Sequence, residues 1–417
     1  MIDLQVLRSN PETIVESLNS RGTKIDIEEI IALDKEIRED QYALEQNQSQ
    51  LNTLSKSIGK LVKEGKDISD IKRETGRLSS NIKDSKQEIQ EKKETLSQKL
   101  LYIPNILDKR VPVGREEDNV EIRRWGDQYK KESGTPHYEI SKKLKIFDFE
   151  AGAKLSGSGY TVLRSNGSKL ERALANFFLD QATADDYEEI SVPFVVNRDV
   201  MFGTGQLPKF EEDMYGIDKN EKFLIPTGEV PITNIGRDLI LKESDLPIKM
   251  TGYTPCFRRE AGSYGKDTRG IIRQHQFMKV ELVRYEREEN SAEALEEMVN
   301  AVENLLRLLK IPHRVVLLAS RDVGFGSAIT YDVEMWLPGP QEYKEISSIT
   351  NYKDFQARRM MLRYKTEDGQ RKFVHTLNGS ALALGRTIAA VVENYYEDGK
   401  ITVPEVLRPY MKCDSIQ

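Results

Sequence analysis

Apolar residues in the N-terminal part of the chain recur every seven positions, the repeat of helices that pack along a narrow seam. Between residues 30 and 61 they follow two registers, and polar Asp40 and Asn47 interrupt the second. The repeat resumes after KEGKD, and the apolar positions are Ile30, Ile37, Leu44, Leu51 and Ile58 with Leu33, Leu54 and Leu61, then Ile71 and Leu78 with Ile82, Ile89, Leu96 and Ile103. This pattern predicts an antiparallel helical hairpin over about 27–103, an arm that projects about 50 Å at ~1.5 Å per residue.

The rest of the chain alternates short β-like runs with helical patterns. Runs such as YEEISVPFVV and IPHRVVLL indicate strands, and apolar spacing predicts helices at 168–184, 291–310 and 386–397. The proline- and glycine-containing linker NILDKRVPVGREEDN separates this part from the hairpin. Because the strands lie beside hairpin signals, we predict an α+β domain at 111–417, with an antiparallel sheet and flanking helices rather than a doubly wound fold, after an N-terminal domain at 1–110.

One strand-like segment, residues 256–286, carries polar residues at every second position. Residues two apart on a strand share a face, so Ile272, Met278, Val280 and Leu282 would lie opposite a polar set formed by Arg269, Arg273, His275, Phe277, Lys279 and Glu281. The intervening AGSYGKDTRG predicts a hairpin with a long loop. A solvated sheet face gives the same alternation as a binding site, so other segments must decide between the two.

Composition narrows the class of protein. A chain of 417 residues, 38% hydrophobic and 31% charged, allows two or three soluble domains. The start MIDLQVLRSN lacks a hydrophobic signal core, and no apolar run approaches the ~18 residues that span a bilayer, so we expect a cytoplasmic protein without membrane contact. Cys256, Cys413 and four scattered histidines argue against a zinc site. Nucleotide-bound Mg²⁺ stays open because it needs only one or two carboxylates.

The charges of the hairpin are unevenly distributed. The net charge of −6 argues against a uniformly basic nucleic-acid binder, but it allows a local basic patch. Acidic residues outnumber basic ones over 26–54, whereas basic residues are in excess over 55–99. The tip and the returning helix would therefore suit a phosphate backbone, with a merely solvated coiled-coil surface as the alternative.

The arginines of segment 256–286 suit an anionic substrate such as ATP, because guanidinium groups bind phosphate oxygens in pairs. Phe277 could stack on the base. The chain has neither a P-loop nor a Gly-x-Gly-x-x-Gly motif, so side chains would have to bind the phosphates. Near the C-terminus, in LNGSALALGRTIAAVVENYY, small residues directly precede an apolar helix that has Arg386 in its first turn. Small residues permit close backbone approach, and the start of a helix favours bound anions. Packing against a neighbouring strand is the alternative use of its glycines.

Several segments, in order along essentially the whole chain, resemble the bacterial type of seryl-tRNA synthetase, a class II aminoacyl-tRNA synthetase. A single motif would be a weak signal, but the ordered set is specific. YEEISVPFVVN resembles class II motif 1, which would place Pro193 at the dimer interface. CFRREAGSYGKDTRGIIRQHQF resembles motif 2, and NGSALALGR resembles motif 3. Three shorter segments resemble signatures of the family: GTGQLPKF, PTGE and EISSITN.

The resemblance implies a role for each matching residue. Arg258 would contact the α-phosphate and Arg386 the γ-phosphate, which makes them the catalytic pair, and the further ATP-binding residues would be Glu260, Arg273, Phe277, Glu345 and Ser348. Of these, Glu345 and Ser348 would hold ATP-bound Mg²⁺. The serine site would comprise Thr227, Glu229, Arg258, Glu281, Asn378 and Ser380.

The implied activity is ATP-dependent attachment of L-serine to tRNA-Ser through a seryl-adenylate, with tRNA-Sec as a second candidate acceptor. The implied assembly is a homodimer, in which the arm of one subunit reaches the long variable region of tRNA-Ser bound to the other. For Glu229, an ion pair with a nearby arginine is the alternative to a substrate contact. Two positions depart from the usual motifs, namely Arg259 in motif 2 and Ala381, where motif 3 commonly has glycine.

Other classes of protein fit less well. A non-catalytic relative that merely binds tRNA should have lost some of five residues that are all present: Arg258, Glu260, Glu281, Glu345 and Arg386. A ligase that charges a carrier protein would resemble the C-terminal domain without the arm. A purely structural coiled coil would leave residues 111–417 unexplained.

Overall fold

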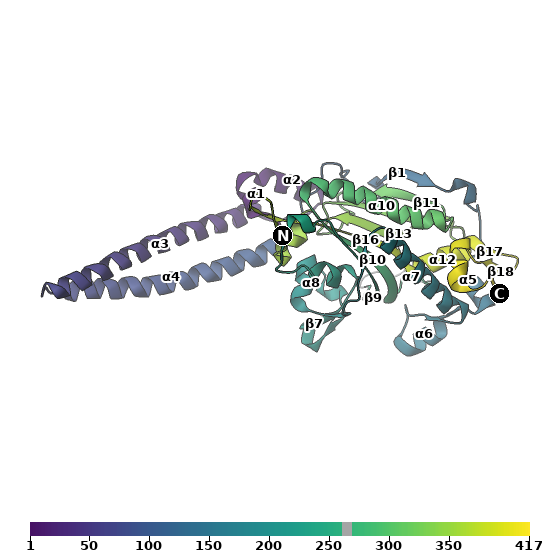
Figure 1. Ribbon diagram of the computed structural model, residues 1–417, viewed down its shortest axis with the longest axis horizontal. Helices are drawn as coiled ribbons and strands as arrows, with labels where there is room; N and C mark the ends of the chain where they lie inside the picture. The colour runs from purple at the N-terminus through teal and green to yellow at the C-terminus, as the bar shows by residue number, and fades with distance from the viewer. Residues whose placement is uncertain (261–268) are drawn as a thin grey trace. The chain divides into compact units, whose positions relative to one another are not determined.

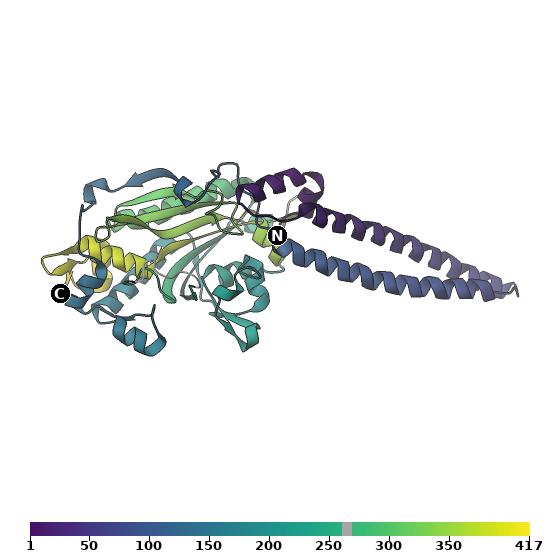
Figure 2. The ribbon, with the colours of Figure 1, turned by 180° about the vertical axis from the view of Figure 1, so that it is seen from behind.

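The computed structural model describes residues 1–260 and 269–417, and the chain divides into two compact units (Figures 1 and 2). One unit comprises residues 2–104, and the other comprises residues 105–417 together with Met1. Residues 261–268 of the predicted loop AGSYGKDTRG lie outside the described part. None of the helices in the described ranges combines the length and apolar composition that a bilayer crossing requires.

The N-terminal unit contains the predicted helical hairpin. Two short helices, α1 (Leu4–Ser9) and α2 (Pro11–Ser20), precede α3 (Ile27–Lys63), and α4 (Ser69–Leu101) returns along α3 (Figure 1). The side chain of Asp26 caps α3 by accepting a 3.0 Å hydrogen bond from the backbone N–H of Glu29, which satisfies one of the free donors at the helix start. The antiparallel hairpin expected from the heptads is therefore confirmed.

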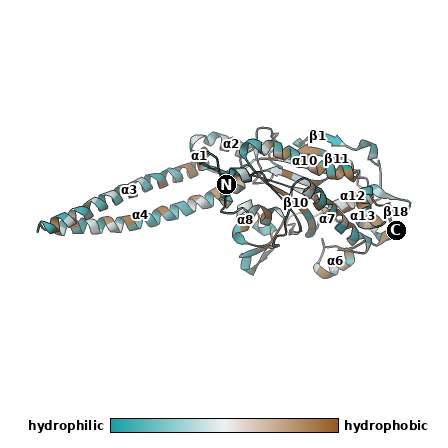
Figure 3. Ribbon diagram, in the orientation of Figure 1, coloured by the Kyte–Doolittle hydropathy of each residue, from teal (hydrophilic) through white to brown (hydrophobic). Residues whose placement is uncertain are grey.

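The seam between α3 and α4 is narrow. Leu44, Ile82 and Ile89 are buried against one another, and Leu51 packs on them. Figure 3 shows that hydrophilic residues dominate the rest of both helices. Asp40, which breaks the apolar register, lies 2.6 Å from Lys92 on the opposite helix, so the interruption is an interhelical ion pair.

An eight-stranded sheet forms the centre of the C-terminal unit, with strand order β1-β11-β12-β13-β16-β10-β9-β4. All neighbouring strands pair antiparallel except β4 and β9. This confirms the antiparallel sheet predicted in preference to a doubly wound fold. The strands are β1 (Val120–Trp125), β4 (Glu188–Glu189), β9 (Ile248–Phe257), β10 (Gln276–Glu286), β11 (His313–Leu317), β12 (Ile329–Leu337), β13 (Glu342–Asn351) and β16 (His375–Ala383).

One face of this sheet packs on helices α7 (Asn166–Ala184), α10 (Ser291–Leu308) and α12 (Leu384–Tyr395), which are the helices predicted from apolar spacing. Side chains from these helices and from the strands form one apolar core, to which β10 contributes Val280 and Leu282. Because side chains alternate along a strand, Lys279 and Glu281 point to the opposite face. The sheet thus has one apolar face and one polar face.

Shorter elements surround the sheet. Its smaller neighbours have the orders β15-β14-β8, β17-β18-β19, β2-β3 and β5-β7-β6. The remaining helices are α5 (His137–Leu144), α6 (Phe149–Ser156), α8 (Arg198–Thr204), α9 (Glu229–Asn234), α11 (Phe355–Met360) and α13 (Arg408–Met411). The remaining strands are β2 (Phe147–Asp148), β3 (Val162–Leu163), β5 (Val195–Asn197), β6 (Gly216–Ile217), β7 (Lys222–Leu224), β8 (Ile240–Lys242), β14 (Arg363–Lys365), β15 (Arg371–Phe373), β17 (Tyr396–Glu397), β18 (Lys400–Thr402) and β19 (Ser415–Ile416).

Candidate active site

A cavity of about 330 Å³ opens on the polar face of the sheet. Strands β10, β13 and β16 supply its floor, and the segment 226–229 and the first turn of α12 supply walls. The cavity brings together every residue that the sequence suggested for ATP or serine: Thr227, Glu229, Arg258, Glu260, Arg273, Phe277, Glu281, Glu345, Ser348, Asn378, Ser380 and Arg386. Pro193 lies outside it and is exposed.

The polar alternation of segment 256–286 holds only where the chain is a strand. Strand β10 begins at Gln276, and the alternate residues Phe277, Lys279 and Glu281 line the cavity. Arg273 also lines it, but from the irregular segment before the strand. The expectation of one common face for all six residues is therefore too broad.

Three residues of that segment do not follow the predicted faces. Arg269 is exposed and absent from the cavity wall, and Ile272 lines the cavity although alternation assigned it to the core side. His275 instead packs against the ring of Tyr160, with centroids 5.3 Å apart, and its Nδ1 lies 2.9 Å from the carbonyl oxygen of Arg258. A period-two pattern cannot place residues that precede the strand.

A bulge in β13 brings Glu345 and Ser348 to the same face. Glu345 pairs with Glu334 of β12 and Ser348 with Asp332, while the register shifts by one residue between them. Without the extra residue, positions three apart on a strand would point to opposite faces. The bulge therefore lets a carboxylate and a hydroxyl, both oxygen donors of the kind that Mg²⁺ prefers, line the same cavity.

A second irregularity places Arg386. Ser380 of β16 pairs with Glu281, whereas Ala383 pairs with Lys279, so β16 carries one residue more than β10 over this stretch. The chain then enters α12, and Arg386 in its first turn donates hydrogen bonds to the carbonyl oxygens of Glu345 at 2.7 Å and Ile272 at 3.2 Å.

The unusual Ala381 of motif 3 lies on the other side of β16. It is 2% exposed and belongs to the core between the sheet and the helices, whereas the neighbouring Ser380 lines the cavity. The departure from glycine therefore adds a methyl group to the core side, away from the substrate face.

One end of the cavity is basic and carries an aromatic ring. The guanidinium carbon of Arg258 lies 5.3 Å from the centroid of the Phe277 ring, and its Nε donates to the carbonyl oxygen of Pro226 at 3.2 Å. The carboxylate of Glu345 lies 3.3 Å from Arg386. Burial alone would raise the pKa of Glu345, but the charges of Arg386 and Arg258 hold this pKa below its usual value. Glu345 is thus ionised and suited to a cation.

Arg273 and Glu260 form an ion pair of 2.7 Å at the same end. Glu260 lies three residues after the end of β9, and Arg273 lies three residues before the start of β10, so the pair joins the two limbs of the motif 2 hairpin. In the described part of the chain, Nε of Arg273 is buried and has no hydrogen-bond partner. The guanidinium therefore retains a donor that a substrate oxygen can satisfy.

The other end of the cavity is acidic. The ammonium of Lys279 lies 2.5 Å from Glu281 Oε2 and donates to Thr227 Oγ1 at 2.7 Å, and both Lys279 and Glu281 are buried. A Cβ at Gly228 would lie 3.1 Å from the Cβ of Glu281, so the bare backbone allows this close approach. The sequence placed Lys279 on the right face but assigned it no role, since the ion pair depends on side-chain geometry.

Glu229 is buried beside this cluster. Burial and the charge of Glu281 raise its pKa to about 7, against lowering contributions that include a hydrogen bond from Gln356. Gln356 Nε2 lies 2.7 Å from Glu229 Oε1, so the partner of this carboxyl is an amide rather than the arginine considered as an alternative. Gln356 lies on α11, far away in sequence, and no local pattern indicates the contact.

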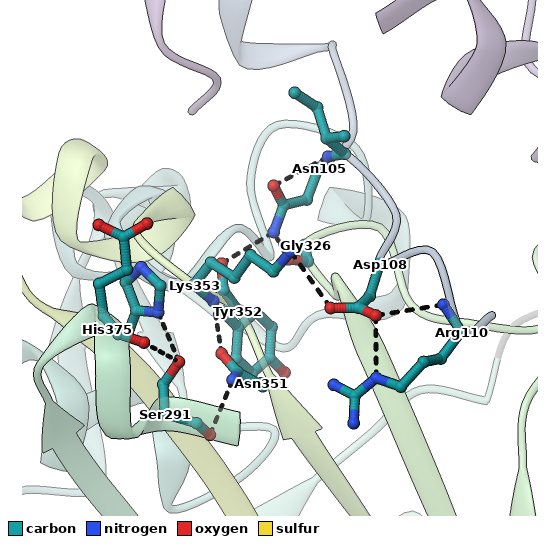
Figure 4. Close-up of polar contacts among 11 residues, drawn as sticks. Asn105, Asp108, Arg110, Ser291, Gly326, Asn351, Tyr352, Lys353 and His375 are labelled. Atoms are coloured by element: carbon teal, nitrogen blue, oxygen red, sulfur yellow. Dashed lines mark hydrogen bonds and ion pairs between the residues drawn. The ribbon is translucent and has the colours of Figure 1, made fainter. Parts of the chain in front are cut away.

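A buried polar network supports the end of β13, where Tyr352 lines the cavity (Figure 4). Asn105 Nδ2 donates to the carbonyl oxygen of Tyr352 at 2.8 Å, and Asn351 Nδ2 donates to that of Ser291 at 3.0 Å. Ser291 Oγ lies 2.7 Å from Nδ1 of His375. These contacts fix the backbone that presents Tyr352.

A sheet of this kind, with arginines at the strand ends and at the head of the last long helix around one cavity, defines a class II aminoacyl-tRNA synthetase. The family model described as the tRNA synthetase class II core domain (G, H, P, S and T) matches residues 209–395. The model of the seryl-tRNA synthetase N-terminal domain matches residues 1–107.

Relatives over the full length narrow the class further. A serine–tRNA ligase from Carboxydothermus hydrogenoformans is 49% identical, covering 100% of this chain and 99% of its own, and one from Thermodesulfovibrio yellowstonii is 47% identical with 100% of both covered. The crystal structure of seryl-tRNA synthetase from Pyrococcus horikoshii complexed with ATP superposes with a TM-score of 0.94 at 34% identity, covering 100% of this chain and 99% of the other. The chain belongs to the seryl-tRNA synthetase family.

Proposed function

We propose that this protein attaches L-serine to tRNA-Ser in two steps, through a seryl-adenylate. The observation that carries the proposal is the division of one cavity into a basic end with an aromatic ring and an acidic end with two buried carboxyl groups. The basic end suits a nucleoside triphosphate, and the acidic end suits the ammonium group of an amino acid. A substrate bound across both ends would place its carboxylate beside the α-phosphate.

In the first step the serine carboxylate attacks the α-phosphorus of ATP, and pyrophosphate leaves. Arg258 would neutralise the α-phosphate, and Arg386 would bind the γ-phosphate. Phe277, with the guanidinium of Arg258 5.3 Å from its ring centroid, would stack on the adenine. Positioning and charge neutralisation can account for this transfer without a protein nucleophile.

Arg273 and Glu260 complete the proposed ATP site. Arg273 can donate to a phosphate oxygen through its Nε, which has no partner among the described residues, or its Nη1 can exchange Glu260 for a phosphate oxygen. Glu260 would then accept from the adenine amino group. An exchange of partners would keep the half-buried guanidinium of Arg273 paired with an anion before and after ATP binds, which limits the desolvation cost.

Glu345 and Ser348 would hold Mg²⁺ together with phosphate oxygens. Their donor set fits the ion, because Mg²⁺ commonly uses one or two protein oxygens and completes its shell with phosphate and water. When bound, Mg²⁺ supplies positive charge to the phosphates. Glu345 is ionised beside Arg386, so it can contribute a negative oxygen at neutral pH.

Serine would be recognised at the acidic end, by Thr227, Glu229, Glu281, Asn378 and Ser380, with Arg258 contacting its carboxylate. A site whose buried polar groups expect a hydroxyl rejects alanine, because those groups would remain unpaired. Threonine would be rejected by its extra methyl group. In the second step the 3′-terminal ribose hydroxyl of tRNA attacks the seryl carbonyl carbon, and AMP leaves.

The helical hairpin is the proposed tRNA-binding element, with tRNA-Sec as a second candidate acceptor. Support comes from the basic excess of residues 55–99 and from the exposure of Lys60, Lys63, Lys72 and Arg77 near its tip. We further propose a homodimer with Pro193 in the interface, where the adjacent Phe194 and Val195 are also exposed, 40% and 43% respectively. The proposed setting is the cytoplasm.

The test is ATP–pyrophosphate exchange by the purified protein without tRNA, with serine, threonine, alanine and glycine compared. We expect exchange that depends on serine. Folded protein that exchanges pyrophosphate with none of the four would contradict the proposal and favour a non-catalytic tRNA binder. Serine-dependent exchange followed by transfer to a carrier protein rather than tRNA would identify the other kind of ligase.

A further inference from the structure

A buried His–Glu pair lies behind the ATP end of the cavity and outside its wall. Nδ1 of His137, the first residue of α5, lies 2.6 Å from Oε1 of Glu393 on α12. The side chains are 4% and 0% exposed. Glu393 also accepts hydrogen bonds from the backbone N–H groups of His137 and Gly339, each at 2.9 Å. Both carboxylate oxygens therefore take part in hydrogen bonds, and the carboxylate fixes the orientation of the imidazole ring.

The other ring nitrogen of His137 holds the segment that carries Arg273. The backbone N–H of Ile271 donates to Nε2 at 3.1 Å. Because Nε2 accepts this bond, the proton of the neutral ring lies on Nδ1 and is donated to Glu393. Gly270 has φ 86°, and a Cβ there would lie 1.9 Å from Nε2, so only glycine allows the backbone to approach the ring.

Helix α12 thus holds the segment 270–273 at two points. Arg386 donates directly to the carbonyl oxygen of Ile272, and Glu393 acts through His137 on the N–H of Ile271. The two side chains are seven residues apart on α12, which places them on the same side about two turns apart. The carbonyl and the N–H of consecutive residues are therefore tied to one rigid element.

We propose that His137 and Glu393 are positioning residues for ATP: they set the place of the Ile271–Arg273 segment and hence of the Arg273 guanidinium. The inference rests on the proposed use of the cavity for ATP. The proposed role concerns ATP and not serine, because the serine end of the cavity is built from β10, β16 and α9 and does not contact this pair. Loss of the pair should weaken ATP binding and leave serine binding nearly unchanged.

Two substitutions of His137 separate its two hydrogen bonds. The amide of asparagine reaches the place of Nδ1 only, so His137→Asn keeps a donor for Glu393 and leaves the buried N–H of Ile271 unpaired. The amide oxygen of glutamine reaches the place of Nε2, so His137→Gln keeps the acceptor for Ile271 and loses the donor to Glu393. If the bond to Ile271 positions the ATP site, the asparagine variant is the more impaired.

The first measurement is calorimetric titration of ATP and Mg²⁺ into the full chain without serine. We expect roughly tenfold weaker ATP binding by His137→Asn, the range for an unpaired buried donor, and at most about threefold weaker binding by His137→Gln. Wild-type affinity in the asparagine variant, or equal losses in both variants, would overturn the proposal. ATP binding without serine-dependent exchange would contradict the proposed function alone, and an inability of the wild type to bind ATP would overturn both.

Pyrophosphate exchange provides the second measurement. We expect His137→Asn to raise KM for ATP about tenfold while KM for serine stays within about twofold. Parallel increases in both constants would indicate general loss of structure and overturn the proposal. The matched control is His313→Asn, since His313 is also buried, lies 3.6 Å from Glu303 and does not line the cavity. It should lower the Tm and leave KM for ATP unchanged.

A milder variant decides the matter if His137→Asn does not fold. Glu393→Gln preserves the side-chain volume and keeps one oxygen as the acceptor for His137. Its amide NH₂ group then faces the N–H of Gly339, so two donors meet there. The imidazole is then less firmly oriented, and we expect KM for ATP to rise about threefold at an unchanged KM for serine. An unchanged KM for ATP in folded Glu393→Gln would overturn the role of the pair.

Discussion

Serine binding should become stronger between pH 6 and pH 8, and Glu229 should be the cause. Burial and the neighbouring Glu281 raise the pKa of Glu229 to about 7. With that pKa, about one tenth of the carboxyl groups are ionised at pH 6, about half at pH 7 and about nine tenths at pH 8. Only the ionised form attracts the serine ammonium, which stays protonated throughout this range.

The magnitude follows from the same pKa. If protonated Glu229 binds serine at least tenfold more weakly, as expected for the loss of a charged partner, KM for serine falls about five- to tenfold between pH 6 and pH 8. At pH 7, serine binding should release about half a proton per site. Exchange kinetics at saturating ATP measure the first quantity, and calorimetry in buffers of different ionisation enthalpy measures the second.

Glu229→Gln is the control. It keeps the side-chain volume, cannot ionise, and should give a KM for serine that is high and flat over this pH range. A wild-type KM that does not change with pH would refute the assigned pKa. The same slope in wild type and variant would refute the assignment to Glu229.

Three further outcomes test other parts of the molecule. Glu281→Ala should abolish serine dependence of exchange while ATP affinity stays within about threefold, and unchanged serine kinetics would place the pocket elsewhere. Lys279→Met removes a cation that lowers the pKa of Glu229, so the pH midpoint for serine should move upward; a downward shift would contradict the geometry. Deleting residues 30–100 should spare exchange and reduce tRNA charging more than 100-fold, whereas equal loss of both activities would refute the division of labour.

The features that the sequence predicted well are local. The heptads of the hairpin, the helix after NGSALALGR and the alternation of β10 depend on spacing within one element, and the structure bears these out. The broad assignment of sheet and helices succeeded for the same reason. Residue types in ordered motifs then indicated which side chains should meet, and all of them line one cavity.

The features that escaped prediction arise between elements. The bulge of β13 puts Glu345 and Ser348 on one face, and an even-numbered spacing rule would have separated them. Gln356 reaches Glu229 from a helix 127 positions further along the chain. His137 contacts Ile271 across 134 positions. Such contacts depend on how helices and strands that are distant in sequence pack together, and the periodicity within one element does not predict them.

The narrow seam of the hairpin constrains how the arm can change in length. The apolar positions that each helix presents to the other repeat with a period of seven residues, and cross-helix pairs such as Lys92 with Asp40 depend on that register. An insertion in α3 that is not a multiple of seven residues would turn its remaining apolar residues away from α4, and a whole heptad added to α3 alone would displace the cross-helix pairs. Viable length variants should therefore gain or lose whole heptads in both helices at once, in increments of about 10 Å. The reach of the arm is thus a stepwise quantity, adjustable only in matched units.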